Sequence, residues 1–379
     1  MKIVIAPDKF KGSLTAPEAA RAIEQGVLRC NPEAATVLVP VADGGEGTLD
    51  SLIAATGGTS VPVRVTGPLG EPVEAAYGIT GDGRTAVIEM ARASGLLLVP
   101  PARRDPLRTT TYGTGELIRH ALDAGCRSFI LALGGSATND GGAGMLEALG
   151  MRLTDRDGRK IGPGGGEIGR IANVDASGFD PRIAESSFVI ASDVTNPFIG
   201  AEGASRVFGP QKGADADKVE RLEEAMASWA GRMEEATGVR VRDMPGAGAA
   251  GGLGGALLAF FPAVMRRGID VVAACCRLRE KLQGADLVLT GEGAIDGQTA
   301  GGKAPLGVAE EARRLGIPVI ALAGSVGAGA GKLNDLGFAS IHSIVNGPMT
   351  LEEAVGRAAE LLELAAEQAV RAFNAGRRR

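Results

Sequence analysis

The sequence has 379 residues, of which 45% are apolar and 22% charged, and its net charge is −5 at pH 7. This length and balance predict a globular protein of two domains, and a chain without a basic excess is not expected to bind nucleic acid. Four cysteines without a CxxC pair and only two histidines argue against a disulfide framework and a His/Cys zinc site. We therefore expect a cytoplasmic protein with small-molecule partners, whereas assembly into a homo-oligomer stays open.

One uncharged stretch, residues 244–265, is long enough to span a bilayer. It contains six glycines and two prolines, and only 253–261 are strongly apolar. We therefore interpret it as a glycine-rich loop that enters a buried helix, and expect no membrane span. The short apolar run that ends at Ala6 does not resemble a signal peptide.

The first elements in chain order alternate between strand and helix. Residues 2–6 form a short apolar strand, and Thr15 with Glu18 three positions later forms the capping box of a helix. A second strand, 36–41, leads into ADGGEGT and a helix from Leu49. Such alternation predicts a parallel sheet whose ligand-binding loops follow the carboxyl ends of its strands.

The pattern changes in the middle of the chain. Residues 61–65, 73–79 and 85–90 alternate with a period of two and are separated by turn sequences, which predicts antiparallel strands. A helix is expected at 113–125 and a strand at 129–133.

Strand–loop–helix order returns from residue 285, and a last amphipathic helix is expected at 351–373. We therefore predict an α/β fold in which both chain ends, 1–66 and 285–379, build one domain. A mixed α/β domain, 67–284, is inserted between them, and the active site is expected in the cleft between the two domains.

Two loops of the first domain carry charges beside small residues. APDKFKGS places Lys9 and Lys11 before a helix N-terminus, where backbone N–H groups attract an anion. Two solvated lysines are the alternative. ADGGEGT places Asp43 and Glu46 around paired glycines, and two carboxylates at a strand end suit Mg²⁺. An ordinary acidic helix start is the other interpretation.

Further loops combine amides, acids and glycines in the inserted domain. LGGSATNDGG contains Asn139 and Asp140, and its density of small residues favours a phosphate or sugar cradle over a structural turn. Asp193 follows the expected strand SFVIA and so projects from a strand's carboxyl end, where ligands bind. The alternative is that Asp193 caps a turn. An amide and residues of FGPQKGA complete this candidate site: Asn196, Gln211 and Lys212.

The loop TGEGAIDGQTAGGKAP contains the spacing G-x-x-x-x-G-K. Ala304 stands where a P-loop has the Ser or Thr that binds Mg²⁺, and the loop is expected to begin several residues beyond the strand end. We therefore reject a P-loop and keep the hypothesis that Lys303 binds phosphate, with Glu292 and Asp296 as metal ligands. Two neighbours are candidates for contacts to nucleotide or substrate, Gln298 and Thr299.

GAGAAG at 246–251 matches the dinucleotide fingerprint G-x-G-x-x-G, and Asp270 follows in the chain. The segment before it is short, charged and ends in Pro245, so no clear strand leads into it. An NAD-dependent oxidoreductase is therefore only the lesser alternative.

Together these segments resemble the bacterial glycerate kinases of the type that yields 2-phosphoglycerate. The strings that carry the resemblance run in order from residue 6 to 305: APDKFKGSLTA, ADGGEGT, GGSATNDGG, SDVTNPF, FGPQKGA, PGAGAAGGLGG and TGEGAIDGQTAGGKAP. Each string is short, but seven in series are specific. The resemblance implies a flavodoxin-like domain from both chain ends, an inserted mixed α/β domain, and ATP, Mg²⁺ and D-glycerate as ligands.

Phosphoryl transfer requires alignment, charge neutralisation and an acceptor for the hydroxyl proton. Because both histidines lie outside the glycine-rich loops, a carboxylate is the expected base, and Asp193 is the first candidate with Asp43 in reserve. Lys9, Lys303 and Lys212 are expected to bind the triphosphate or the glycerate carboxylate. Two alternatives stay open: a kinase that yields 3-phosphoglycerate, and a regulatory protein that binds nucleotide or acid without turnover.

Overall fold

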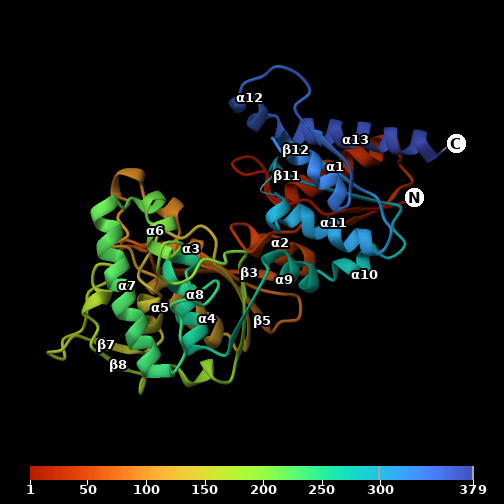
Figure 1. Ribbon diagram of the computed structural model, residues 1–379. Coiled ribbons are helices and arrows are strands. Elements are labelled where there is room, and N and C mark those ends of the chain that lie inside the picture. The colour runs from red at the N-terminus through yellow and green to blue at the C-terminus, as the bar shows by residue number, and fades with distance from the viewer. Residues whose placement is uncertain (298, 378–379) are drawn as a thin grey trace. The chain divides into compact units, whose positions relative to one another are not determined.

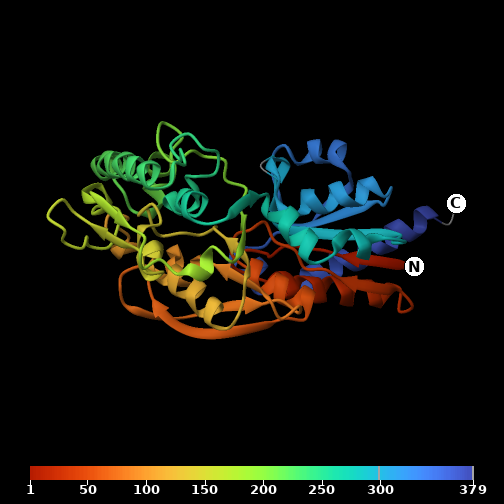
Figure 2. The same ribbon diagram turned by 90° about the horizontal axis from the view of Figure 1, so that it is seen from below.

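The computed structural model describes residues 1–297 and 299–377. Contacts divide the chain into two units (Figures 1 and 2). The first comprises Met1–Asp43, Asp50–Gly57 and the residues from Arg267 onward, and the second comprises Gly44–Leu49 and Gly58–Arg266. Figure 1 shows both chain ends, in red and blue, in the same unit.

The limits of these units differ from the expected 1–66 with 285–379 and 67–284. β3 (Thr59–Thr66) pairs with β4 (Pro72–Ile79) along its whole length, which ties it to the second unit. α9 (Gly268–Cys275) and α10 (Leu278–Leu282) both contact α11 (Ala304–Arg314), so they belong with the first unit.

The first unit is built on a parallel sheet with the order β13-β12-β11-β1-β2. This is the flavodoxin-like order, which confirms the predicted fold class. Because the direction of sheet growth reverses between β1 and β11, the carboxyl ends of these two strands form the crevice where such sheets bind ligands. The strands are β1 (Lys2–Ile5), β2 (Ala35–Leu38), β11 (Leu287–Ile295), β12 (Val319–Val326) and β13 (Phe338–Ser343).

Helices α1 (Ala16–Cys30) and α13 (Ala358–Arg377) cover one core of this sheet, which includes Ile3 and Ile5 of β1. The two helices approach closely at Gly26, where a Cβ would lie 2.1 Å from the carbonyl oxygen of Glu363.

The predicted capping box of α1 is confirmed. The Thr15 hydroxyl accepts a hydrogen bond from the backbone N–H of Glu18 at 3.3 Å, and the Glu18 carboxylate accepts one from the N–H of Thr15 at 2.9 Å.

The second unit is built on a mixed sheet with the order β10-β9-β6-β5-β4-β3. β3, β4 and β5 are antiparallel, as their alternating pattern predicted, whereas β5, β6, β9 and β10 are parallel. The loops that follow the parallel strands therefore open at one edge of the sheet. The strand bounds are β5 (Thr85–Glu89), β6 (Ser128–Ala132), β9 (Ser187–Ala191) and β10 (Ala263–Arg266). β7 (Arg152–Thr154) and β8 (Asn173–Asp175) form a separate two-stranded sheet.

The uncharged stretch 244–265 contains α8 (Ala249–Phe260) and all of β10 except Arg266, and Leu253 and Leu257 of α8 are buried in the core, as predicted. Within the described ranges, no helix is long and apolar enough to cross a membrane. The helices not yet bounded are α2 (Thr48–Thr56), α3 (Ala91–Ser94), α4 (Tyr112–Asp123), α5 (Ala143–Ala148), α6 (Ala204–Phe208), α7 (Ala216–Thr237) and α12 (Leu351–Gly356).

Two elements differ from the sequence prediction. β11 continues to Ile295 because it pairs with β12 up to Val326. The helix expected at 351–373 is two helices, α12 and α13, which are separated at Arg357. Gly356, a weak helix former, ends the first of them.

Candidate active site

Asp8 lies at the switch point of the first sheet, three residues beyond β1. Its backbone N–H donates to the Gly291 carbonyl in β11 at 2.8 Å, and the residue is 4% exposed. Burial raises the pKa of Asp8 from 3.8 to about 7; Lys9 opposes this shift, and the carboxylates of Asp43 and Glu292 add to it. Sequence reasoning missed Asp8, although its place just after a buried strand was an available signal.

A connected group joins Glu292, in the second half of β11, to Thr299 and Lys303, which follow the strand. Glu292 is 8% exposed and accepts hydrogen bonds from the Thr299 hydroxyl at 3.0 Å and the Lys303 ammonium at 3.4 Å. Burial raises the pKa of Glu292, and the Lys303 charge opposes the shift. Lys303 immediately precedes α11, an 11-residue helix, so its side chain stands where backbone N–H groups attract anions.

The loop that contains Lys303 follows β11 more closely than expected. β11 ends at Ile295 and the G-x-x-x-x-G-K spacing begins at Gly297, so the prediction of a start several residues beyond the strand is wrong. Pairing with β12 up to Val326 extends the strand. Strand, glycine-rich loop and helix now follow one another in the order that suits phosphate. Gln298 lies outside the described residues.

Positive charge from the loop after β1 lies at the same crevice. The Lys9 ammonium is 3.9 Å from Oδ1 of Asp8. Lys11 is exposed, and it lines a separate groove of the first unit. Both lysines therefore follow β1 as predicted, and Lys9 is the one that reaches the buried carboxylate.

The carboxylates expected to bind Mg²⁺ are divided between the units. Asp43, Glu292 and Asp296 belong to the first, whereas Glu46 is exposed on a loop of the second. The Asp296 backbone N–H donates to the Thr299 hydroxyl at 3.3 Å, which closes a turn. Among the residues that the structure describes, no group of three or more His, Cys, Asp or Glu is arranged to hold a metal ion.

Lys212 is buried in the second unit, with 2% of the residue exposed. Its ammonium donates to the Thr138 carbonyl at 2.6 Å. Burial lowers the pKa of Lys212 from 10.5 to about 7, and the charge of Asp140 opposes the shift. The buried Asn139 donates from Nδ2 to the Ser205 hydroxyl at 3.1 Å, while its Oδ1 has no partner in the described chain. Hydrogen-bonding capacity therefore remains unused here.

Asp140 is 1% exposed and surrounded by donors from its own chain. It accepts hydrogen bonds from the Thr111 backbone at 2.7 Å, the Thr111 hydroxyl at 2.9 Å and the Gly142 backbone at 3.1 Å. The carboxylate thus joins the residue before α4 to the loop before α5. A direct contact between Asp140 and substrate stays a prediction.

Several glycines of the second unit are explained by packing. A Cβ at Gly141 would lie 2.4 Å from Cδ1 of Trp229, and one at Gly251 would lie 2.0 Å from the Thr138 carbonyl oxygen. Ala250 adopts φ of +52°, which is strained for a residue other than glycine. The segments GGSATNDGG and PGAGAAGGLGG therefore pack directly against each other. Residues 192–262, all described, contain no strand that could lead into a dinucleotide fingerprint.

Asp193 is exposed two residues beyond β9, so it does follow the carboxyl end of a strand as predicted. Three residues later in the chain, the Asn196 side chain donates to the Glu202 carbonyl at 2.8 Å. Gln211 is exposed in the turn before Lys212. The roles predicted for Asp193, Asn196 and Gln211 in catalysis and substrate binding therefore stay predictions.

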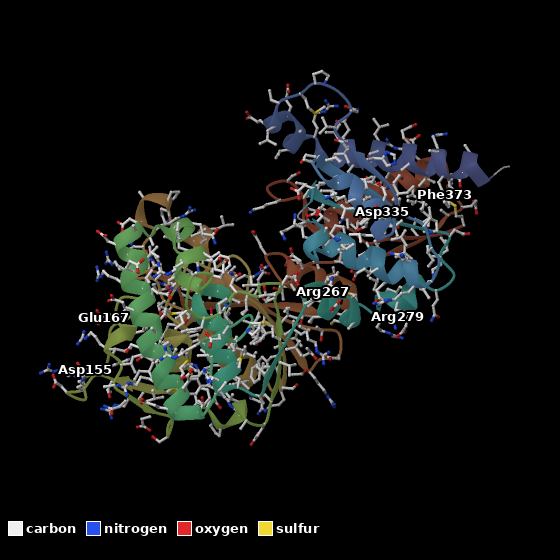
Figure 3. The ribbon with its side chains drawn as sticks, in the orientation of Figure 1. Asp155, Glu167, Arg267, Arg279, Asp335 and Phe373 are labelled. Carbon is white, nitrogen blue, oxygen red and sulfur yellow. The ribbon has the colours of Figure 1, made fainter. Side chains whose placement is uncertain are left out.

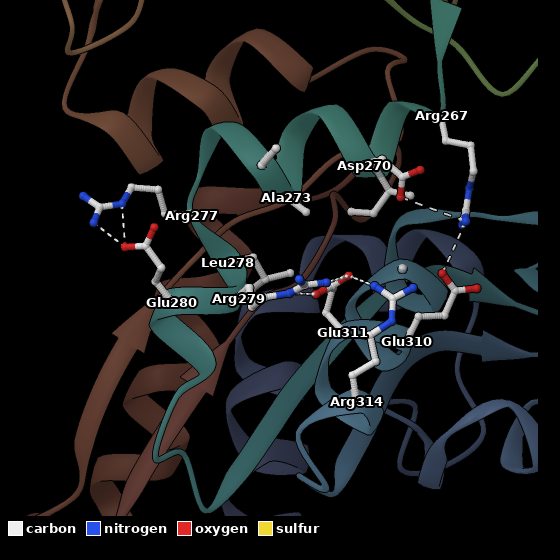
Figure 4. A pocket seen from close by; sticks show the side chains of 13 residues that line it. Arg267, Asp270, Ala273, Arg277, Leu278, Arg279, Glu280, Glu310, Glu311 and Arg314 are labelled. Carbon is white, nitrogen blue, oxygen red and sulfur yellow. Dashed lines mark hydrogen bonds and ion pairs between the residues drawn. The ribbon is translucent and has the colours of Figure 1, made fainter.

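A cavity of about 490 Å³ lies among α9, α10 and α11 (Figure 4), and Figure 3 labels two arginines of its lining, Arg267 and Arg279. Arg267 is held by Glu310 at 3.3 Å, and Arg279 by Glu311 at 2.8 Å. Figure 4 shows two further pairs, Arg277 with Glu280 and Arg314 with Glu311. Because each arginine meets a carboxylate, this cavity offers little free positive charge to a triphosphate.

Known proteins resemble this chain along nearly its whole length. Residues 3–374 match the glycerate kinase family. The chain belongs to the glycerate kinase family. The glycerate kinase of Bacillus subtilis (strain 168) is 53% identical over 363 residues, which cover 96% of this chain and 95% of the relative. The glycerate 2-kinase of Escherichia coli (strain K12) is 51% identical over 354 residues, 93% of each chain.

A solved structure supports the same assignment. The crystal structure of a candidate glycerate kinase 2 from Salmonella typhimurium LT2 is 51% identical, with a TM-score of 0.91 and 100% of both chains covered. The α/β fold described above is therefore that of the glycerate kinase family. As a member of this family, the protein is an enzyme, and its class is that of the kinases.

Proposed function

We propose that this enzyme transfers the γ-phosphoryl group of ATP to a hydroxyl of D-glycerate and releases 2-phosphoglycerate and ADP. The observation that carries the proposal is the contact of Lys303, at the start of α11, with Glu292, in the second half of β11. A kinase family implies ATP as donor, and the name of the Escherichia coli relative, glycerate 2-kinase, supports the 2-hydroxyl as acceptor. The cytoplasm remains the expected compartment.

Lys303 is the residue proposed to bind the triphosphate. Its compact charge at a helix N-terminus adds to the attraction of the helix for phosphate. The ion pair with Glu292, at 3.4 Å, keeps the Lys303 ammonium beside β11. Lys9 supplies a second positive charge from the loop after β1, and Thr299 contributes a hydroxyl from the same loop as Lys303.

Mg²⁺ would neutralise charge on the transferring phosphoryl group. It is commonly held by one or two carboxylates together with phosphate oxygens and water. Asp43 and Glu292 fit this role, because their negative charges act on the buried Asp8 and add to the rise of its pKa. Negative charge is therefore crowded at the crevice, and a divalent cation would relieve it. Asp296, which follows β11 in the same unit, stays a candidate ligand, and Glu46, on an exposed loop of the second unit, stays a prediction from the sequence alone.

The residues proposed as general base and as glycerate-binding groups belong to the second unit. Asp193 is proposed as the general base that takes the hydroxyl proton, because it is an exposed carboxylate just beyond a parallel strand. Lys212 is proposed to bind the glycerate carboxylate. Amide and carboxylate groups are proposed to orient the substrate: Asn139, Asp140, Asn196 and Gln211.

A coupled assay of ADP release tests this function. Purified protein with Mg·ATP should release ADP only when D-glycerate is added, and Mg·ATP alone should raise the melting temperature because it binds the folded state. Binding of ATP without turnover in the presence of D-glycerate would instead favour the regulatory alternative. If Mg·ATP neither binds nor is turned over, the result contradicts the kinase assignment for this chain.

A further inference from the structure

Arg267 immediately precedes α9 and is held beside α11 by the packing of these two helices. Where they meet, a Cβ at Gly307 of α11 would lie 2.4 Å from Cγ1 of Ile269, which is buried in α9. The backbone carbonyl of Arg267 accepts a hydrogen bond from the Val271 N–H at 3.2 Å, so Arg267 is joined to the first turn of α9. Its side chain therefore starts from a fixed point beside the first turns of α11.

The carboxylates that pair with Arg267 contact one nitrogen of its guanidinium group (Figure 4). Nη1 lies 3.3 Å from the Glu310 carboxylate of α11 and 4.0 Å from that of Asp270. Nη2 is buried and has no hydrogen-bond partner in the described part of the chain. The carboxylates therefore leave open the edge formed by Nε and Nη2.

That edge lies against Gly302, the residue before Lys303. A Cβ at Gly302 would lie 3.6 Å from Nε, 3.6 Å from Nη2 and 3.9 Å from Cζ of Arg267. Gly302 adopts a φ of +113°, a backbone conformation that residues with a side chain rarely adopt. Because Gly302 has no side chain, the guanidinium group lies directly against the backbone that leads into Lys303.

The ion pair with Glu310 does not by itself account for this arrangement. A buried N–H group without an acceptor costs free energy. A side chain that served only Glu310 could leave Nη2 in solvent, because 40% of the Arg267 side chain is exposed. The burial of Nη2 therefore indicates a role for the guanidinium group at Gly302.

The position of Lys303 depends on its backbone, because its side chain is held loosely. Its ammonium is 3.4 Å from the Glu292 carboxylate, and within the described residues its side chain makes no capping hydrogen bond to α11. Misplacement of a substrate-binding group by about 1 Å can cost about 10²-fold in rate. A residue that fixes Gly302 therefore affects the reaction through Lys303.

We propose that Arg267 is a positioning residue for phosphoryl transfer. It holds Gly302 in place, and through Gly302 it sets the position of the Lys303 ammonium at the start of α11. The inference rests on the function proposed above, in which Lys303 binds the triphosphate. Arg267 acts through Lys303 and not through a contact of its own with ATP.

Arg267→Met tests the inference, because methionine keeps an apolar stem and removes the guanidinium group. The kcat/KM for ATP should fall about 10- to 100-fold, while the KM for D-glycerate stays within about twofold. Arg279→Met is the matched control, since Arg279 pairs with Glu311 of the same helix at 2.8 Å but is not among the atoms nearest to Gly302. This control should leave the kinetics with ATP unchanged.

A double-mutant cycle with Lys303→Ala separates positioning from general stabilisation. If Arg267 acts through Lys303, Arg267→Met should change kcat/KM for ATP by no more than about twofold once Lys303 is replaced, because coupled residues are not additive. An equal loss in both backgrounds overturns the inference. So does a loss of the same size in Arg279→Met, or a KM for D-glycerate that rises as much as the KM for ATP.

Arg267→Lys repeats the test if Arg267→Met does not fold, because lysine keeps a charge for Glu310 but lacks the planar guanidinium group. It should show the same selective loss with ATP. Full activity with ATP would reduce Arg267 to an ion-pair partner of Glu310 and overturn the inference. Absence of ATP-dependent turnover in the unmodified enzyme, or unchanged kinetics of Lys303→Ala alone, would instead refute the proposed function or the role of Lys303 in it.

Discussion

Replacement of Lys212 by methionine should remove a pH-dependent part of the stability of the second unit. Burial lowers the pKa of this lysine from 10.5 to about 7 in the folded protein. Between these values the unfolded chain binds a proton that the folded protein lacks, so the free energy of unfolding rises with pH. Below pH 7 both states are protonated and this contribution is lost.

The magnitude follows from the width of that window. Each pH unit corresponds to about 1.36 kcal/mol, so the interval from about 7 to 10.5 amounts to roughly 4–5 kcal/mol. Lys212→Met abolishes the rise, because methionine does not titrate. It also removes the hydrogen bond to the Thr138 carbonyl, which costs about 1–3 kcal/mol at every pH. The variant should therefore be the more stable protein near pH 6 and the less stable one near pH 10.

The natural fluorescence of the chain provides the assay. Trp229, the one tryptophan of the sequence, is buried in α7, and its Nε1 donates to the Gly141 carbonyl at 3.0 Å. Urea unfolding followed at this residue reports on the second unit. From pH 6.5 to 9.5 the free energy of unfolding of the unmodified protein should rise by about 3 kcal/mol relative to that of Lys212→Met. Lys332→Met, at an exposed lysine of the first unit, should leave the pH dependence unchanged.

If the free energy of unfolding of the unmodified protein and of Lys212→Met changes with pH in parallel, the lowered pKa of Lys212 is refuted. The same residue can be followed during binding. If Lys212 meets an anionic substrate, its pKa rises in the complex, and binding above pH 7 takes up a proton. Calorimetry in buffers of different ionisation enthalpy measures that uptake. Binding without proton uptake would leave Lys212 as a structural brace for the Thr138 loop.

Three further changes test the proposed roles. Lys303→Ala should raise the KM for ATP, lower turnover, or both, and activity equal to that of the exposed control Lys332→Ala would return Lys303 to an ordinary surface lysine. Asp193→Asn should lose about 10²- to 10⁴-fold in turnover while melting cooperatively and still binding ATP; retention of more than about a tenth of the activity places the base elsewhere and makes Asp43→Asn the next variant. Removal of divalent cations by EDTA should abolish turnover and added Mg²⁺ should restore it, so full activity without added metal would contradict the proposed role of Mg²⁺.

Elements whose signals are local could be predicted from the sequence. The Thr15–Glu18 box is a short-range hydrogen-bond pattern, and the alternating residues of β3 and β4 announce an antiparallel pair. The length of β11 could not be predicted, because its last residues are strand only through pairing with β12, whose partners come about 30 residues later.

The site could be predicted only in outline for the same reason. Lys303 follows a strand and precedes a helix, which its own neighbours reveal, whereas the pKa of Asp8 depends on burial and on Asp43 and Glu292 from distant segments. The contacts of Asp140 with Thr111 join residues 29 positions apart, so their bracing role was hidden. Chemistry that depends on distant residues requires coordinates.

Phosphorus NMR of the reaction product tests the central claim most directly. Incubation of the purified enzyme with Mg·ATP and D-glycerate should yield ADP together with the resonance of 2-phosphoglycerate, identified by addition of the authentic compound. A resonance of 3-phosphoglycerate would keep the kinase and correct the acceptor hydroxyl. ATP that remains intact, or that yields only ADP and inorganic phosphate, would contradict the phosphorylation of D-glycerate by this chain.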